Sequence, residues 1–359
     1  MTVTVAGREA LPTPSLPVAW AEEITGPLLC TRVVDVTHDV RSFELSPAQP
    51  LSFRPGEYLT LTVLVDGVEH QRCYTISSPP TRPDLLTITV KRVPDGPVSN
   101  WLHERLRVGD TVRASGPLGR FSMANHPASR YLFLSAGSGI TPLMSMTRTL
   151  RDRPEPTDLV FVHNARTPDD IIFRSELDAL AARADIAIAT ICEDDSPSER
   201  WRGARGRLSL PMLLAIAPDL LDREIFSCGP PPYMAAVREL LALAGVDPAR
   251  CHEESFDLGA DAPAAGDPDS ATVQYTVELL RSRRTISCGS DTPVLDAAQQ
   301  AGLTLPSSCG EGMCGTCKST LLHGRVDMAH AGGIRPREIA DNKILLCCSR
   351  PCEDLVIDA

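Results

Sequence analysis

The stretch "SSCGEGMCGTCKS" (Ser307–Ser319) places three cysteines, Cys309, Cys314 and Cys317, in one glycine-rich loop. Their spacing is Cys-x4-Cys-x2-Cys. Thiolates held this close together are suited to ligating a metal centre, and the interspersed glycines let the backbone approach it. The loop therefore predicts a metal centre whose fourth ligand comes from elsewhere in the chain.

The spacing is typical of plant-type [2Fe–2S] loops, whose fourth cysteine follows later in the sequence. Cys347, Cys348 and Cys352 are the downstream candidates. We favour Cys347, because it directly follows the strand-like run "ILL", whereas Cys348 would point to the opposite face of an extended chain. A structural zinc site is the alternative, but zinc ligands usually come as two short Cys-x2-Cys pairs.

Composition excludes several classes of function. The chain has 359 residues, which is enough for two or three domains. Its formal net charge of −11 argues against nucleic acid as a partner, since phosphate binding needs a basic surface. No apolar run has the length of a membrane span, and residues 1–25 lack the features of a signal peptide. We therefore expect a cytoplasmic monomer that binds neither nucleic acid nor membrane, with its 12 cysteines reduced.

The pattern along the chain predicts an N-terminal arm, three domains and a linker. Residues 1–25 are rich in proline and form the expected arm. Residues 26–125 alternate short β-rich runs with turn residues, which is typical of an antiparallel β-barrel. Residues 126–256 alternate apolar runs with helical stretches, which predicts a parallel, doubly wound sheet. Residues 257–271 carry four Asp and no basic residue, and predict a flexible linker to a third domain, residues 272–359.

Two motifs in the second domain predict a nucleotide site. The first, "GSGITP" (Gly137–Pro142), follows an apolar run and opens a helix, whose N-terminus favours a pyrophosphate. The second, "CGPPPYM" (Cys228–Met234), follows the last sheet strand, at the edge where ligand crevices form. It places Cys228 to face a bound nicotinamide. A tight strand–helix turn and a buried structural cysteine are the alternatives.

The first domain contains a candidate flavin site. In "RCYTISSP" (Arg72–Pro79), Arg72 can pair with a pyrophosphate, Tyr74 can pack on a flavin, and Thr75 can hydrogen-bond the flavin N5 edge. Downstream, "GPVS" (96–99) precedes the helix-like run "NWLHERL", so we expect Ser99 to cap a second anion-binding helix. A plain sheet strand and an ordinary helix cap are the alternatives.

The combination of these three sites suggests a function. A nicotinamide cofactor delivers two electrons together, whereas a plant-type cluster accepts one at a time. A flavin handles both, so it belongs between them. We therefore expect an enzyme that passes electrons from NAD(P)H through a flavin to a cluster. A redox-sensing or interaction protein without turnover is the alternative from another class.

On these motifs, over about residues 27–359, the chain resembles a ferredoxin–NADP reductase-family flavoprotein fused to a C-terminal plant-type [2Fe–2S] ferredoxin. Such proteins serve as reductase components of bacterial oxygenases. The resemblance is greatest to those of Rieske-type oxygenases of the glycine betaine monooxygenase and N-demethylase type. It implies an antiparallel β-barrel FAD domain, an α/β doubly wound NAD(P) domain and a β-grasp [2Fe–2S] domain. It also implies a separate terminal oxygenase of Rieske type as electron acceptor, with a cytochrome P450 or di-iron hydroxylase as the alternative.

The resemblance further implies roles for single residues. The expected catalytic residues are Thr75, Cys228 and Glu254. The expected cofactor-binding residues are Arg72, Tyr74, Thr75, Gly96, Val98, Ser99, Gly137, Gly139, Thr141, Pro142, Arg166, Gly229, Pro230 and Phe256. The expected iron ligands are Cys309, Cys314, Cys317 and Cys347.

The resemblance favours FAD over FMN and, by a smaller margin, NADH over NADPH. Arg166 and Arg174 flank "TPDDIIF" beyond the second sheet strand, where either side chain could bind a 2′-phosphate. His163, His252 and His330 have no partner that the sequence reveals, so we expect packing or solvated roles for them.

Overall fold

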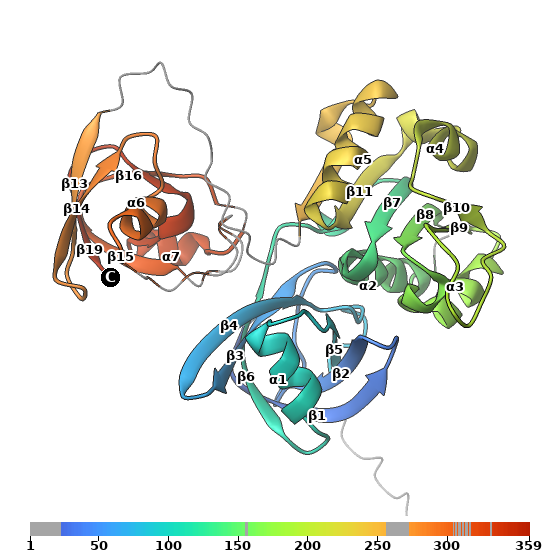
Figure 1. The fold of residues 1–359 in the computed structure, drawn as a ribbon, viewed down its shortest axis with the longest axis horizontal. Coiled ribbons are helices and arrows are strands. Elements are labelled where there is room, and N and C mark those ends of the chain that lie inside the picture. The colour runs from blue at the N-terminus through green and yellow to red at the C-terminus, as the bar shows by residue number, and fades with distance from the viewer. Residues whose placement is uncertain are drawn as a thin grey trace, which may run out of the picture.

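The computed structural model describes residues 23–154, 157–255 and 273–359, apart from residues 304, 306, 308, 309, 311, 313, 314, 316 and 331. Most of the predicted arm and the whole predicted linker lie outside the described residues, as do the predicted site residues Phe256, Cys309 and Cys314. Three main sheets follow one another along the chain (Figure 1). None of the described helices combines the length and the apolar character that a membrane span requires.

The first sheet is antiparallel and curls into a barrel. Its strands are β1 (Ile24–Asp35), β2 (Val40–Ser46), β3 (Tyr58–Val65), β4 (Val68–Thr75), β5 (Leu86–Lys91) and β6 (Thr111–Leu118), in the order β4-β3-β6-β1-β2-β5. The edge strands β4 and β5 come together next to a bridge between Ile76 and Ile88, which closes the barrel. Helix α1 (Pro97–Arg105) packs on β3 and β4. Strand β1 includes Ile24 and Thr25, the last two residues of the predicted arm, because they pair with β6.

The second sheet is entirely parallel. Its strands are β7 (Arg130–Ala136), β8 (Asp158–Ala165), β9 (Ile186–Cys192), β10 (Ala204–Arg205), β11 (Glu224–Gly229) and β12 (Cys251–Ser255), in the order β10-β9-β8-β7-β11-β12. Helices α2 (Ile140–Arg151) and α3 (Arg174–Ala181) cover one face, and α4 (Leu210–Ile216) and α5 (Pro231–Leu243) cover the other. The predicted doubly wound sheet is therefore confirmed. Short 3-10 turns are η1 (Met123–Asn125), η2 (Gly137–Gly139), η3 (Pro168–Asp170), η4 (Leu220–Asp222) and η5 (Pro248–Arg250).

Three phenylalanines hold the central strands of this sheet in register. Phe133 of β7 lies between Phe161 of β8 and Phe226 of β11, with edge-to-face ring centroids 5.9 and 5.8 Å away. All three side chains are fully buried. Aromatic pairs of this geometry add about 0.5–1.5 kcal/mol beyond the burial of their area. The strands therefore form a rigid platform for the loops at their carboxyl ends.

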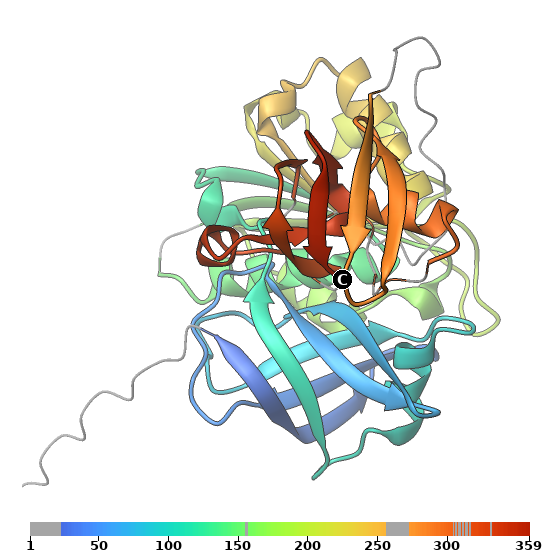
Figure 2. The same ribbon diagram turned by 90° about the vertical axis from the view of Figure 1, so that its left-hand side faces the viewer.

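The third sheet is mixed and has the order β14-β13-β19-β15-β17. These strands are β13 (Gln274–Leu279), β14 (Arg284–Gly289), β15 (Lys318–His323), β17 (Lys343–Leu345) and β19 (Leu355–Asp358); β16 (Val326–Met328) and β18 (Ser349–Pro351) form a separate pair. Helix α6 (Val294–Gln300) contributes to the core beneath the sheet, and α7 (Pro336–Ala340) and η6 (Leu346–Cys348) are short. Figure 2 shows the orange and red strands side by side. This is the predicted β-grasp arrangement.

Candidate functional site

Strand β4 carries the three residues of the predicted flavin motif. Arg72 and Tyr74 stand opposite Leu61 and Leu59 of β3, so their side chains share one face of the strand. Thr75 is buried at the end of the strand. Burial raises the pKa of the Tyr74 phenol well above its usual range, and the charge of Arg72 offsets only part of this effect. The motif thus presents a cation and a neutral phenol together beside α1.

Helix α1 begins before Ser99, the residue that was predicted to cap it. Pro97 is its first residue and Gly96 its N-cap, without a side-chain cap, so the prediction that Ser99 is the cap was wrong. Proline suits this position because it lacks the N–H that would stay unbonded in the first turn. The Ser99 hydroxyl instead donates to the Gly96 carbonyl at 3.2 Å and accepts the Val93 N–H at 3.2 Å. Ser99 therefore fixes the loop whose helix packs against the flavin motif.

The segment after the flavin motif is anchored to helix α2 of the second sheet. The Ser145 hydroxyl donates to the Ser78 carbonyl at 2.8 Å, and Arg148 Nη1 donates to the Ser77 carbonyl at 2.6 Å. Arg148 also forms a two-pronged ion pair with Glu176 of α3. The backbone just beyond Thr75 is thereby held by the helix that carries the predicted pyrophosphate motif.

The "GSGITP" motif forms η2 and the first turn of α2. Gly137 has a φ of +53°, a left-handed conformation that favours glycine. A Cβ atom on Gly139 would lie 2.3 Å from the carbonyl oxygen of Cys228, so no larger residue fits there. The Thr141 hydroxyl donates to the Ser138 carbonyl at 3.0 Å, and Pro142 is buried as the third residue of α2. The fold thus joins the two predicted nucleotide motifs directly.

Cys228 and Glu254 are neighbours at the carboxyl end of the sheet. Cys228 stands opposite Glu254 on β12 and opposite Ser135 on β7. Cys228 and Glu254 are buried. Burial, and to a smaller extent the Glu254 carboxylate, raise the pKa of the Cys228 thiol well above its usual value. The thiol is therefore protonated and unsuited to nucleophilic attack. Gly229 is buried next to it, and Pro230 is the exposed N-cap of α5.

The structure adds two residues that sequence analysis missed. Asn164, near the end of β8, donates from Nδ2 to the Ser135 carbonyl at 3.1 Å and to the Tyr233 hydroxyl at 3.0 Å. Tyr233 lies so close to Gly229 that a Cβ atom on that glycine would be 2.7 Å from its ring. Burial raises the pKa of the Tyr233 phenol. The sequence could have indicated Asn164, because it lies near the carboxyl end of a predicted parallel strand, where ligand-binding residues are common.

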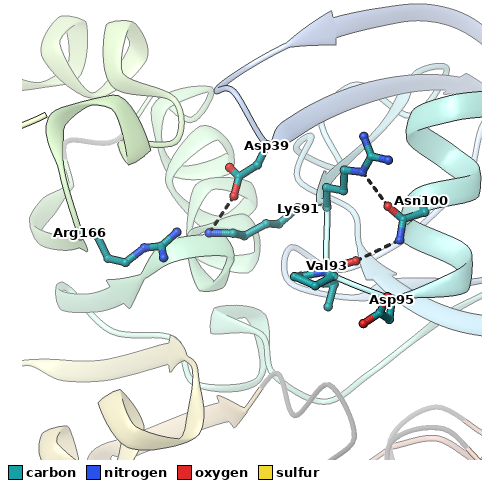
Figure 3. A pocket seen from close by; sticks show the side chains of 8 residues that line it. Asp39, Lys91, Val93, Asp95, Asn100 and Arg166 are labelled. Atoms are coloured by element: carbon teal, nitrogen blue, oxygen red, sulfur yellow. Dashed lines mark hydrogen bonds and ion pairs between the residues drawn. The ribbon is translucent and has the colours of Figure 1, made fainter. Parts of the chain in front are cut away.

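Arg166 reaches a pocket of about 740 Å³ between the barrel and the loop after β8 (Figure 3). The lining residues are Asp39, Lys91, Arg92, Val93, Pro94, Asp95, Asn100 and Arg166. The Arg166 side chain is 67% exposed and lies 3.6 Å from the Asp170 carboxylate, and Lys91 pairs with Asp39 at 3.3 Å. Arg174 is engaged elsewhere, because it binds Glu199 at 2.5 and 2.9 Å. Of the two predicted arginines, Arg166 is the one at the pocket.

The cysteines Cys317 and Cys347 lie side by side in the third unit. Their Sγ atoms are 3.2 Å apart, without a disulfide bond, and both residues are buried. The Gly312 N–H donates to Cys347 Sγ at 3.2 Å, and the Cys347 N–H points to Cys317 Sγ at 3.5 Å. Gly312 has a φ of +68°, as a loop that turns its amide inward requires. Paired sulfur atoms with amide donors fit the thiolate ligands of an iron–sulfur cluster.

We preferred Cys347 to Cys348 because we expected an extended chain at these two residues, and this expectation was wrong. Residues Leu346–Cys348 form the 3-10 turn η6 and not an extended strand. A 3-10 turn has about three residues per turn, so neighbouring side chains still point in different directions. Cys348 is half-buried, and its Sγ lies 3.7 Å from the Leu345 carbonyl oxygen.

The cysteine-bearing unit contacts the barrel near the flavin motif. Arg335 Nη2 donates to the Pro117 carbonyl at 3.1 Å, and the same guanidinium pairs with Glu23. The loop preceding Arg335 is bonded to the cysteine loop, since the Gly333 N–H donates to the Gly312 carbonyl at 2.9 Å. A short path of bonded residues thus joins the barrel to the cysteine loop.

Comparisons with known proteins agree with this architecture. Residues 28–123 match the oxidoreductase FAD-binding domain family, residues 133–239 the oxidoreductase NAD-binding domain family, and residues 277–352 the 2Fe-2S iron-sulfur cluster binding domain family. The glycine betaine monooxygenase reductase subunit of Pseudomonas aeruginosa is 45% identical over 92% of this chain and 94% of its own length. The stachydrine N-demethylase reductase subunit of Rhizobium meliloti is 41% identical over 93% and 96%.

Solved structures share the fold. Phthalate dioxygenase reductase has a TM-score of 0.55 at 24% identity, over 93% of this chain and 97% of its own. An Amycolatopsis cytochrome P450 reductase has a TM-score of 0.57 at 26% identity, over 65% of this chain and 71% of its own.

These findings define an NAD(P)H-dependent oxidoreductase that carries FAD and a [2Fe–2S] cluster. More narrowly, the chain belongs to the family of oxygenase reductase components that includes the glycine betaine monooxygenase reductase subunit. The predicted fold class, cofactors and enzyme class are thereby confirmed. The roles of single site residues stay predictions.

Proposed function

We propose that this chain is the reductase component of a Rieske-type, N-demethylating monooxygenase, to which it delivers electrons from NADH. The observation that carries the proposal is the near full-length identity of 45% and 41% with reductase subunits of glycine betaine monooxygenase and stachydrine N-demethylase. FAD and the cluster supply the conversion of a hydride into single electrons. The residues of the chain bind these groups, orient them and exclude water.

The barrel holds FAD in this proposal. Arg72 pairs with the pyrophosphate, which also accepts the N–H groups at the start of α1, along Gly96, Val98 and Ser99. Tyr74, which is partly buried against the barrel core, packs its ring on the flavin. Thr75 hydrogen-bonds the N5 edge, held in place by the anchoring of Ser77 and Ser78 to α2.

The parallel sheet holds the nucleotide. The pyrophosphate lies over Gly137, Gly139, Thr141 and Pro142, where the N-terminus of α2 attracts an anion. The nicotinamide reaches the carboxyl end of β11, where its ring meets Cys228, Gly229 and Pro230, and Glu254 on the neighbouring strand lies toward the flavin ring. The protonated, buried Cys228 supports this role, because it gives the ring an uncharged and dry neighbour. Phe256, which was predicted to lie near the flavin, is outside the described residues.

The surroundings of Arg166 support NADH as the donor. A 2′-phosphate at Arg166 would come close to the carboxylates of Asp170 and Asp39, which already pair with Arg166 and Lys91. NADH has hydroxyl groups there and avoids this repulsion. The cluster ligands in the proposal are Cys309, Cys314, Cys317 and Cys347, of which the contact between Cys317 and Cys347 supports two.

Reconstitution tests the function. The purified holoprotein is combined with a Rieske-type oxygenase from the same cell, and glycine betaine and stachydrine are each offered with NADH. We expect formaldehyde release that needs both proteins and stops without the reductase. The proposal would be contradicted if NADH were oxidised without release of formaldehyde. It would also be contradicted if the reductase passed electrons to a cytochrome P450 and not to the Rieske protein. Size-exclusion chromatography with light scattering tests the proposed monomer, and cell fractionation tests the proposed cytoplasmic location.

A further inference from the structure

Two histidines and a glutamate from three separate segments meet at the boundary between the barrel and the parallel sheet. His126 follows η1 in the segment that joins β6 to β7, Glu224 is the first residue of β11, and His252 lies on β12. One potential ligand atom from each residue lies within 4.8 Å of the other two. None of these residues belongs to the flavin, nucleotide or cluster motifs. This group is called the His126 site below.

The three side chains are already arranged around a common point. The His252 Nε2 atom lies 2.6 Å from the Glu224 Oε1 atom. The rings of His126 and His252 are stacked, with centroids 3.6 Å apart and planes inclined by 24°. Because a ring nitrogen binds an ion in the plane of its ring, one of the two stacked imidazoles must rotate out of the stack before both can bind the same ion. Tetrahedral zinc with bonds near 2.1 Å holds its ligand atoms about 3.4 Å apart, which such a rotation can provide here.

The surroundings favour a bound ion over a solvent-exposed cluster. The side chains of His252 and Glu224 are only 14% and 17% exposed. Phe226 forms an apolar wall, with its ring centroid 4.8 Å from that of His252. Arg250 approaches the other carboxylate oxygen, Glu224 Oε2, at 3.7 Å, so an ion at Oε1 would replace the contact of that oxygen with His252 Nε2. A weaker group, His38 with Asp39 and Asp170, is more exposed, and its two carboxylates already pair with Lys91 and Arg166.

We propose that His126, Glu224 and His252 bind one divalent transition-metal ion of the Zn²⁺ class. Two imidazole nitrogens and one carboxylate oxygen suit zinc, with water in the fourth position. The ion links the segment between β6 and β7, which carries His126, to strands β11 and β12. The same two strands carry Cys228 and Glu254 two residues beyond Phe226 and His252.

The experiment titrates metal-depleted, cluster-loaded holoprotein with Zn²⁺ in competition with a chromophoric chelator. The wild type is compared with Glu224→Gln and His126→Gln, and His38→Gln serves as the matched histidine control. Cysteines also bind zinc, so the informative quantity is the difference between the wild type and each variant in the number of Zn²⁺ ions bound per protein molecule. We expect the two site variants to bind one equivalent less than the wild type and than His38→Gln. Equal binding by all four proteins, or no binding by the wild type, overturns the proposal.

A second measurement guards against a variant that fails to fold. Flavin content and the visible spectrum are measured for every protein, and Glu224→Gln keeps the size of the side chain and a hydrogen bond to His252. Zn²⁺ should raise the Tm of the wild type and of His38→Gln by about 2 °C or more, through preferential binding to the folded state. If Zn²⁺ raises the Tm of Glu224→Gln by the same amount, the proposed site is wrong. This test holds even if zinc binding by cysteine thiols obscures the titration.

Discussion

The Sγ atoms of Cys317 and Cys347 lie 3.2 Å apart although 30 residues separate them in the chain. The two residues form no disulfide bond, and the amide of Gly312 is directed at the Sγ atom of Cys347. The pair thus defines the side of the cysteine loop on which iron is expected.

Replacing Cys347 should remove the cluster. We expect Cys347→Ser to lose most of its bound iron and its iron–sulfur absorption, while NADH still reduces an artificial two-electron dye at the flavin. Cys348→Ser is the matched control, because Cys348 is the next residue in the chain and its Sγ lies 3.7 Å from the Leu345 carbonyl oxygen. Iron analysis and visible spectra of both proteins check the assignment. Full iron in Cys347→Ser, with loss in Cys348→Ser, would reverse it.

Gly139→Ala should impair use of the nucleotide. The new Cβ would lie 2.3 Å from the Cys228 carbonyl oxygen, so the pyrophosphate loop must move away from β11. A displacement of about 1 Å can cost roughly 100-fold in rate, and we expect kcat/KM for NADH to fall at least tenfold with bound FAD retained. Steady-state kinetics with a dye acceptor measures this. Gly26→Ala, where nothing lies within 4 Å of the added Cβ, should behave as wild type.

Arg335→Ala should slow the step between flavin and cluster. The side chain holds the cysteine-bearing unit on the barrel through Pro117 and Glu23. Loss of hydrogen bonds from a charged group costs about 1.5–3 kcal/mol, so the ratio of docked to undocked molecules should fall about tenfold or more. Stopped-flow spectroscopy should find unchanged flavin reduction and slower cluster reduction. Arg350→Ala is the control, since Arg350 bonds to Asp291 within its own unit. Equal effects of both variants would rule out a specific docking role.

His163 should make the parallel-sheet domain sensitive to acid. The ring is fully buried, with Nδ1 2.8 Å from the Ser135 hydroxyl, and burial lowers its pKa to about 3. In the unfolded chain the pKa is about 6.5, so between these values the unfolded state binds the extra proton. Stability is therefore complete above pH 6.5 and declines by about 1.4 kcal/mol per pH unit below it.

Denaturant unfolding at pH 7 and pH 5 measures this loss, which should be about 2 kcal/mol from His163 alone. In His163→Gln the difference between the two pH values should shrink by that amount. The exposed His323 provides the comparison, and His323→Gln should keep the wild-type difference. An unchanged pH dependence in His163→Gln would show that the folded state accepts the proton.

Arg166→Ala should leave NADH kinetics nearly unchanged. Its guanidinium is 67% exposed and paired with Asp170, and exposed pairs contribute about 1 kcal/mol or less. Steady-state rates with both nucleotides check this, and the wild type should prefer NADH. Arg174→Ala should lower the Tm, because Arg174 binds Glu199 and lies over the Trp201 ring, without changing the preference. A selective loss of NADPH activity in Arg166→Ala would instead identify a 2′-phosphate site.

Sequence patterns predicted the features that depend on local periodicity or on fixed spacing. Continuous apolar runs indicated the parallel strands, and the structure brings Cys228, at the carboxyl end of β11, next to the "GSGITP" turn, while its place facing the nicotinamide stays a prediction. The helix start at Pro97 could also have been predicted, because proline favours the first helical position. We chose Ser99 as the cap and did not use this preference.

Features made by residues far apart in sequence were beyond such patterns. The bond from Ser145 to Ser78 spans 67 residues and depends on how two domains pack. Likewise His252, for which we expected a packing or solvated role, pairs with Glu224 across two strands whose adjacency no local signal gives. His163, for which we expected a packing or solvated role, is fully buried, and its bond to Ser135 depends on the sheet register.

Strand β12 ends at Ser255, directly after Glu254, and the described chain resumes at Val273. The carboxyl end of the parallel sheet is therefore connected to the iron–sulfur domain by 17 residues. A chain of that length spans at most about 60 Å even when fully extended. The acceptor is therefore confined near its donor at an effective concentration on the order of millimolar. Internal electron transfer should consequently be independent of how far the enzyme is diluted, and only delivery to the oxygenase should depend on the abundance of each protein in the cell.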